Sequence, residues 1–386
     1  MGKFKALRPL IESFVANGPA GAACAVTHRG ETVFQEYVGY ADVDTQQLIT
    51  PDTIYRIYSM TKIITCTAAL KLFERGQFLL NDPLAEYLPE FANPQVYRTA
   101  ADGTVYTSPA SSPIRVKDMF TMSSGITYGG ERNETERHTG KVMDELHKRT
   151  DGKYDVRQLS KTLASVPLAF DPGSQWKYGL SHDVLGAFIE VLSGKSFGQF
   201  LQEEIFDPLG MKDTFFRIPD EKKHHLSSFY NRSEDGILTK STELDAHIQP
   251  DATFESGGGG LLSTLGDYST FAYMLAAGGT WQGERILSRK TIQLMSTNHL
   301  EKHQMPYYNW PYLAGYGYGL GVRVMVEPQL GGSNSSLGEF GWSGMLGTWA
   351  LIDPTEELSA VYMQQMFPNF EAVHQPRLRN AIYGAL

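Results

Sequence analysis

Hydrophobic positions at the start of the chain follow two different periods. In residues 1–17, apolar side chains such as Leu7, Ile11 and Phe14 recur at the spacing of one helical face, which predicts a helix. Residues 22–27 and 32–40 are then rich in apolar and β-branched side chains, and a polar segment separates them. This pattern predicts a β-hairpin directly after the first helix.

The middle of the chain is dominated by helical patterns. One helix is expected to begin at Ser59 and to end at Gly76, with its apolar residues toward one side. Between residues 82 and 240, helical segments alternate with long polar loops, and the clearest of these helices covers residues 183–192. Residues 93–113 contain three prolines and many small polar residues, so we expect a loop there.

Strand patterns return in the last third of the chain. A glycine run at residues 257–260 is followed by a predicted helix over 268–276. Residues 318–326, 347–352 and 358–364 are short segments rich in aromatic, β-branched and leucine side chains, with turn signals between them. We therefore expect three strands in this region.

Strands at both ends of the chain, with helices between them, predict an α+β fold. We expect one antiparallel β-sheet that is built from both chain termini and flanked by helices, with a mostly helical domain inserted in the middle. The expected boundaries are residues 1–80 and 250–386 for the sheet domain and 81–249 for the inserted domain. A cleft between the two domains is the expected place for a site.

Composition and charge narrow the classes of function. The 386 residues are 41% hydrophobic and 20% charged, as in ordinary globular proteins. A formal net charge of −9 opposes binding to a polyanion, so we expect no nucleic-acid partner. No apolar run is long enough for a membrane span, no signal-peptide core precedes the first hairpin, and only Cys24 and Cys66 are present. These features predict a cytoplasmic protein with free thiols and no membrane partner.

Candidate chemistry begins with Ser59 and Lys62. Residues three apart on a helix face the same way, so the Lys62 amine can reach the Ser59 hydroxyl and accept its proton if its pKa is lowered. Burial at the positive end of a helix is expected to lower it. The spacing alone is weak evidence, because Ser174 and Lys177 share it, although Ser174 follows a turn and opens no helix.

Two further segments make the Ser59 pattern specific. They are Tyr178-Gly179-Leu180-Ser181 and Gly341-Trp342-Ser343-Gly344, and with Ser59 and Lys62 they resemble, in order and separation, the three motifs of the penicillin-binding-protein-like serine hydrolases. This family shares the class C β-lactamase fold. Leu180 stands where β-lactamases have Asn, and Trp342 stands where they have Lys or His. Both departures are similar to family VIII carboxylesterases and argue against penicillin-type substrates.

The resemblance implies a role for each motif residue. Ser59 is the expected nucleophile, and Lys62 and Tyr178 are its proton-handling partners, with the identity of the base left open. The N–H groups of Ser59 and Met345 are the expected oxyanion hole. The substrate-binding residues are expected to be Leu180, Trp342, Ser343 and Gly344.

The function implied is a serine carboxylesterase for short or medium acyl esters, with acyl transfer as a variant and a small-molecule ester as partner. No cofactor and no metal are expected, because His299 and His303 lack metalloprotease spacing and the run 257–260 lacks a following Lys-Ser or Lys-Thr. We expect that run to be a close backbone approach to the cleft wall. Two alternatives stay open: a β-lactamase or D-amino-acid peptidase, and a non-catalytic binding protein that retains the fold.

Overall fold

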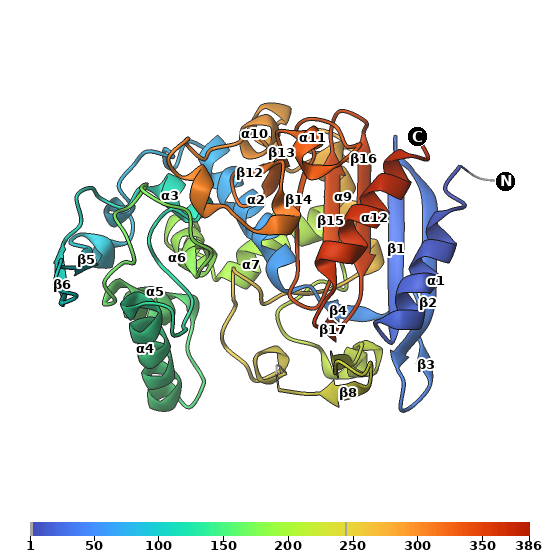
Figure 1. Ribbon diagram of the computed structural model, residues 1–386, viewed down its shortest axis with the longest axis horizontal. Helices are drawn as coiled ribbons and strands as arrows, with labels where there is room; N and C mark the ends of the chain where they lie inside the picture. Colours follow the sequence, from blue (N-terminus) through green and yellow to red (C-terminus); the bar gives the residue numbers. More distant parts are fainter. Residues whose placement is uncertain (1–2, 244) are drawn as a thin grey trace.

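The computed structural model describes residues 3–243 and 245–386, and an eight-stranded antiparallel β-sheet forms its centre (Figure 1). The strand order is β12-β13-β14-β15-β16-β1-β2-β3, so the first strand of the chain lies beside the last long one. Ala23 of β1 pairs with Met363 of β16, which joins the two ends of the sequence. The strands of this sheet are β1 (Gly21–His28), β2 (Glu31–Asp42), β3 (Gln47–Leu48), β12 (Tyr316–Tyr318), β13 (Arg323–Met325), β14 (Phe340–Ser343), β15 (Trp349–Asp353) and β16 (Leu358–Met363).

Helices cover both faces of the sheet. On one face, α1 (Leu7–Asn17) and α12 (Glu371–Tyr383) bury a compact apolar layer that includes Leu7, Trp349 and Leu378. On the other face, α9 (Leu265–Ala276) packs on β1, β15 and β16 and begins the main hydrophobic core. Alternate side chains of one strand point to opposite faces, which explains why β15 and β16 are buried along their whole length.

The segment between the two halves of the sheet is mostly helical and lies at the opposite end of the molecule (Figure 1). Its helices pack on α2 (Thr61–Glu74), whose residues are almost all buried. The principal contact is made by α6 (Ser181–Ser193). The other α-helices of this segment are α3 (Val116–Phe120), α4 (Glu134–Thr150), α5 (Val156–Ala164), α7 (Phe197–Leu201) and α8 (Asp207–Leu209). Two further short helices, α10 (Arg289–Met295) and α11 (Pro328–Gly331), lie later in the chain.

This architecture confirms the predicted fold class, an antiparallel sheet from both termini with flanking helices. The first helix and the hairpin are confirmed as α1, β1 and β2. The domain boundaries at 80 and 250 stay a prediction. One of the short pairings of this segment connects it to the sheet domain. β7 (Phe229–Arg232) pairs with β8 (Leu238–Ser241) inside the predicted insertion and with β17 (Met366–Phe367) outside it.

The expected loop over residues 93–113 is wrong. β5 (Gln95–Thr99) and β6 (Val105–Pro109) form a hairpin there, with Val96 buried against Leu168. The prolines lie just before the first strand, at the end of the second and beyond it, where a missing N–H costs little. Proline content therefore misled the prediction, and neither short strand has the apolar/polar alternation that would have corrected it.

Other differences are smaller. The expected strand 318–326 is two strands, β12 and β13, because the chain turns sharply at Gly321, whose φ is +82°. The predicted helix at Ser59 opens as one 3-10 turn, η1 (Tyr58–Met60), before α2. The segment around Trp342 itself forms strand β14, which a short turn connects to β15. The helix α12 was not predicted at all, because Pro376 and many polar residues hide its apolar face.

Among the residues that the structure describes, no helix combines the length and the apolar character needed to cross a bilayer.

Candidate active site

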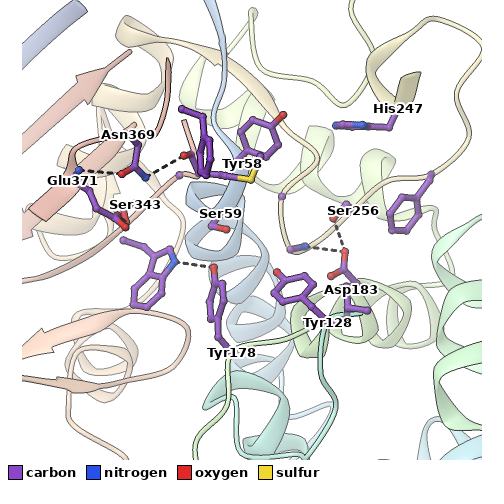
Figure 2. Close-up of a pocket in the computed structure, with 18 of the residues that line it drawn as sticks. Tyr58, Ser59, Tyr128, Tyr178, Asp183, His247, Ser256, Ser343, Asn369 and Glu371 are labelled. Carbon is purple, nitrogen blue, oxygen red and sulfur yellow. Dashed lines mark hydrogen bonds between the residues drawn. The ribbon is translucent and has the colours of Figure 1, made fainter. Parts of the chain in front are cut away.

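A cavity of about 670 Å³ opens above the start of α2, at the junction of the sheet and the helical segment (Figure 2). Ser59 lies at its centre. Aromatic side chains supply much of the lining, and the charged side chains that line it are acidic. The lining includes Tyr58, Tyr128, Tyr154, Tyr178, Asp183, Phe254, Trp310, Tyr312, Trp342 and Glu371.

Ser59 is held by two short strands and a strained residue. β4 (Ile54–Arg56) pairs with β9 (Leu262–Thr264) and leads the chain into the turn η1. Tyr58 has a φ of +42°, a left-handed conformation that is rare for a side chain of this size. Such strain persists only where the surroundings enforce it, and here it directs the next residue into the cavity.

Lys62 lies one turn later on α2, and its side chain is completely buried. Its Nζ donates to Ser59 Oγ at 3.1 Å, to Tyr128 Oη at 3.2 Å and to the carbonyl oxygen of Gly258. An ammonium has three N–H donors and no acceptor, so these three partners use all of them. The geometry fits a protonated Lys62.

Burial by itself lowers the pKa of Lys62, but the phenols of Tyr128 and Tyr178 and the carboxylate of Asp183 outweigh it, and the pKa is raised. The expected lowering of this pKa is therefore wrong in direction. The position of Lys62 near a helix N-terminus did not reveal these groups, because they lie far from it in the sequence. Burial is the largest cause that raises the pKa of Tyr128, and the nearby Lys62 charge opposes it. A protonated Lys62 acts on Ser59 as a hydrogen-bond donor.

Tyr178 is the third member of the predicted cluster, and the structure brings it to the other two. The Lys62 Nζ lies 4.7 Å from the centre of its ring. Its hydroxyl points toward Ser59 (Figure 2) and accepts a hydrogen bond of 3.0 Å from Trp342 Nε1. An indole N–H can only donate, so this contact and the nearby ammonium both stabilise negative charge on the Tyr178 oxygen.

The two N–H groups predicted as an oxyanion hole border the same cavity, since both Ser59 and Met345 line it. Within the described residues, neither N–H donates to another protein group. The turn that carries Met345 is fixed closely to the nucleophile turn. A Cβ added to Gly344 would lie 2.4 Å from the carbonyl oxygen of Ile57 and 2.2 Å from Thr348 Oγ1.

The glycine run forms the floor of the cavity behind Ser59. A Cβ added to Gly257 would lie 2.3 Å from the His182 carbonyl oxygen, and one added to Gly258 would lie 2.5 Å from an Asp183 oxygen. This is the close backbone approach expected from the sequence. The buried Asp183 carboxylate accepts hydrogen bonds from Gly258 N, at 3.2 Å, and from Ser256 Oγ, and burial raises its pKa.

The four residues predicted to bind substrate all line the cavity: Leu180, Trp342, Ser343 and Gly344. Leu180 immediately precedes α6 and is buried apart from its cavity face. The Ser343 hydroxyl is turned sideways and donates to Glu371 Oε2 at 2.8 Å. Glu371 belongs to the unpredicted helix α12, so this contact was not foreseen.

Tyr128 and Glu371 are the functional candidates that sequence reasoning missed. Tyr128 lies between Thr127 and two glycines. An aromatic residue in that setting was the available signal. For Glu371 no local signal existed, because only the folded chain brings it to Ser343.

Ser174, His299 and His303, which only resemble functional motifs in the sequence, are not among the residues that line the cavity. Ser174 lies in a turn, with its N–H bonded to the Asp171 carbonyl oxygen. His299 and His303 interact with the carbonyl oxygens of Leu294 and Gly173. In the part of the chain that the structure describes, no group of three or more His, Cys, Asp or Glu side chains is arranged to hold a metal ion.

Comparison with known proteins shows that almost the whole chain matches one protein family. The sequence model of the beta-lactamase family matches residues 7–383. Protein Rv1367c of Mycobacterium tuberculosis is 31% identical over 355 residues, which cover 91% of this chain and 86% of that protein. Esterase EstB of Burkholderia gladioli is 27% identical, and the alignment covers 94% and 91% of the two chains.

A solved structure agrees on the fold. Simvastatin synthase (LovD) from Aspergillus terreus superimposes with a TM-score of 0.83 at 22% identity, over 99% of this chain and 98% of the other. At 22% identity the similarity establishes the fold alone, and the chemistry has to be inferred from the site residues.

Proposed function

The chain belongs to the beta-lactamase family and is a serine hydrolase, and from that premise we propose that it is a carboxylesterase that forms an acyl-enzyme on Ser59. The observation that carries the proposal is the hydrogen bond of 3.1 Å between Lys62 Nζ and Ser59 Oγ at the centre of an aromatic cavity. An esterase relative that aligns with nearly the full chain supports the substrate class.

In the proposed first step, Ser59 Oγ attacks the ester carbonyl carbon and gives its proton to the Tyr178 oxygen. Lys62 stays an ammonium, because all three of its N–H groups donate and its pKa is raised. Its charge and the Trp342 N–H stabilise the Tyr178 phenolate before the transfer. The carbonyl oxygen becomes an oxyanion, which the Ser59 and Met345 N–H groups stabilise.

In the second half of the cycle, Tyr178 returns the proton to the leaving alkoxide, and the alcohol departs. Water then attacks the acyl-Ser59 ester by the same route and releases the acid. An alcohol in place of water gives acyl transfer from the same intermediate. The volume of about 670 Å³ leaves space for a small acceptor beside an acyl chain.

The lining supports esters over β-lactams or D-amino-acid peptides. Those substrates carry a carboxylate, for which an Arg or Lys side chain is the usual partner. Among the described lining residues there is no Lys or Arg, and the Glu371 carboxylate repels an anion. Leu180 and Trp342 present apolar surface where hydrogen-bonding groups would be needed.

The test is to trap the nucleophile with a p-nitrophenyl alkylphosphonate and to locate the adduct by peptide mass spectrometry. The expected result is one adduct on Ser59, with loss of turnover of p-nitrophenyl butyrate in proportion to labelling. Ser59→Ala should lower kcat by about 10⁴-fold or more and should block labelling.

Ser174→Ala is the matched control, because it removes the other serine of the same spacing. It should leave both labelling and turnover intact. An adduct elsewhere, or nitrocefin turnover faster than ester turnover, would overturn the proposal. Inertness toward the reagent and toward a panel of esters would favour a non-catalytic binding protein.

A further inference from the structure

We propose that the ester this protein recognises carries a permanent positive charge, a quaternary ammonium group bound beside Glu371. The inference rests on the proposed esterase function for the reaction, but the cation site itself stands on separate observations. They are the contacts of Glu371, the rings around it and the charges of the cavity.

Glu371 is a carboxylate without a cationic partner. It is the first residue of α12, half-buried in the cavity wall. It accepts hydrogen bonds from two neutral donors, Ser343 Oγ at 2.8 Å and Gln375 Nε2 at 3.4 Å. No Lys, Arg or His nitrogen of the described residues lies within 4.0 Å of its oxygens. A half-buried carboxylate of this kind gains from a cation supplied by a ligand.

Aromatic rings adjoin this carboxylate. We call Trp310, Tyr312 and Trp342 the aromatic wall. The centroids of Trp310 and Tyr312 are 6.0 Å apart, and those of Trp310 and Trp342 are 6.2 Å apart. Burial and the charge of Glu371 both raise the pKa of Tyr312, because that phenol lies next to the carboxylate. Ring faces attract cations, and quaternary ammonium groups are bound by such aromatic surroundings.

The rest of the cavity has the same electrostatic character. Its second carboxylate, Asp183, lies on the other side of Ser59 from Glu371 (Figure 2). Asp183 is close to the Lys62 ammonium and bonded to Ser256 and Gly258, so its charge is already compensated. Glu371 is therefore the carboxylate that remains available to a substrate. An ester bound across Ser59 would place one of its two arms against Glu371 and the aromatic wall.

The experiment uses isosteres that differ only in charge. Choline butyrate and 3,3-dimethylbutyl butyrate carry the charge difference on the alcohol arm, and the ethyl esters of 4-trimethylammoniobutyrate and 5,5-dimethylhexanoate carry it on the acyl arm. We expect the cationic member of at least one pair to have a kcat/KM about tenfold or more above its neutral partner. A neutral preference in both pairs would overturn the proposal and leave the esterase function standing.

The matched variants are Glu371→Gln and Glu31→Gln. Both remove one negative charge, but Glu31 is exposed at the start of β2 and is absent from the cavity lining. Glu371→Gln should lower the cationic-to-neutral ratio by about tenfold, and Glu31→Gln should leave the ratio unchanged. Equal losses in both variants would mean long-range attraction in place of a local site, which contradicts the proposal.

A binding measurement separates this proposal from the proposed function. Choline and 3,3-dimethylbutan-1-ol are titrated into the Ser59→Ala protein, with tryptophan fluorescence as the signal because Trp310 and Trp342 line the site. Binding of choline that Glu371→Gln weakens would support the cation site even in a protein that hydrolyses no ester. Equal affinity for the two alcohols would contradict it.

Discussion

The catalytic cluster and the aromatic wall face the same cavity but are held in different ways. We define the catalytic cluster as Ser59, Lys62, Tyr128 and Tyr178. Directed hydrogen bonds fix it: the fully buried Lys62 amine donates to Ser59 and Tyr128, and the Trp342 N–H donates to Tyr178. The aromatic wall is fixed mainly by ring contacts, and its Trp310 and Tyr312 are only half-buried.

The difference indicates a division of labour. Hydrogen bonds weaken steeply when their geometry changes, whereas contacts between rings tolerate shifts. Changes in the catalytic cluster should therefore alter the rate for every substrate, and changes in the wall should alter the choice among substrates. Trp342 of the wall connects the two regions, because its ring lines the cavity while its N–H donates to Tyr178.

The largest expected effect that tests this division comes from the two phenols. Tyr178→Phe should lower kcat by about 10² to 10⁴-fold for all esters, because it removes the proposed proton acceptor. Tyr128→Phe removes only one acceptor of the Lys62 ammonium and should cost about tenfold or less. Steady-state kinetics of both variants decide the roles. A larger loss in Tyr128→Phe than in Tyr178→Phe would mean that Tyr128 is the proton acceptor and that Tyr178 has the supporting role.

A second test concerns the turn beside the nucleophile. Gly344→Ala should lower kcat by about 10² to 10³-fold, because its Cβ would collide with the carbonyl oxygen of Ile57 and would displace the Met345 N–H. Met345→Ala is the control, since it keeps that backbone N–H and should retain most activity. If Met345→Ala matched the loss, the side chain and not the N–H would matter. Thermal unfolding of both variants identifies any global destabilisation.

The smallest expected effect tests the wall. Trp310→Leu removes ring surface that also packs on Tyr178, but it leaves the hydrogen bonds of Lys62 to Ser59 and Tyr128 in place. It should therefore lower kcat/KM roughly tenfold for substrates that reach the wall. Acetyl esters, which are too short to fill the cavity, should change less. Measurement of kcat/KM across p-nitrophenyl esters from acetyl to octanoyl distinguishes the cases. A uniform loss for all chain lengths would show that the wall also positions the catalytic cluster.

Much of the fold was readable from local pattern. The first hairpin, the helix after Ser59, the helix after the glycine run and the strands near the C-terminus were predicted correctly, because each is a segment rich in apolar residues that turn or polar residues bound. The motif spacing also indicated which residues to examine, and the structure brings Ser59, Lys62 and Tyr178 together.

What the sequence did not predict depends on contacts between distant segments. The raised pKa of Lys62 comes from Tyr128, Tyr178 and Asp183, which lie far along the chain from it. Glu371 became a candidate only because the fold places it beside Ser343 and the aromatic wall. Its helix was not predicted because the segment is polar and contains Pro376. The hairpin of β5 and β6 was missed because prolines beside strands have the same composition as prolines in loops.

The place of β1 between β2 and β16 has a consequence for the way the chain is synthesised. Ser59 emerges from the ribosome early, whereas β16 and the Met345 turn emerge more than 280 residues later. Until then one side of β1 has no strand partner and is exposed to chaperones or to other nascent chains. A partly translated polypeptide therefore holds its nucleophile without the Met345 N–H of the proposed oxyanion hole. Ester cleavage should appear only when translation is nearly complete.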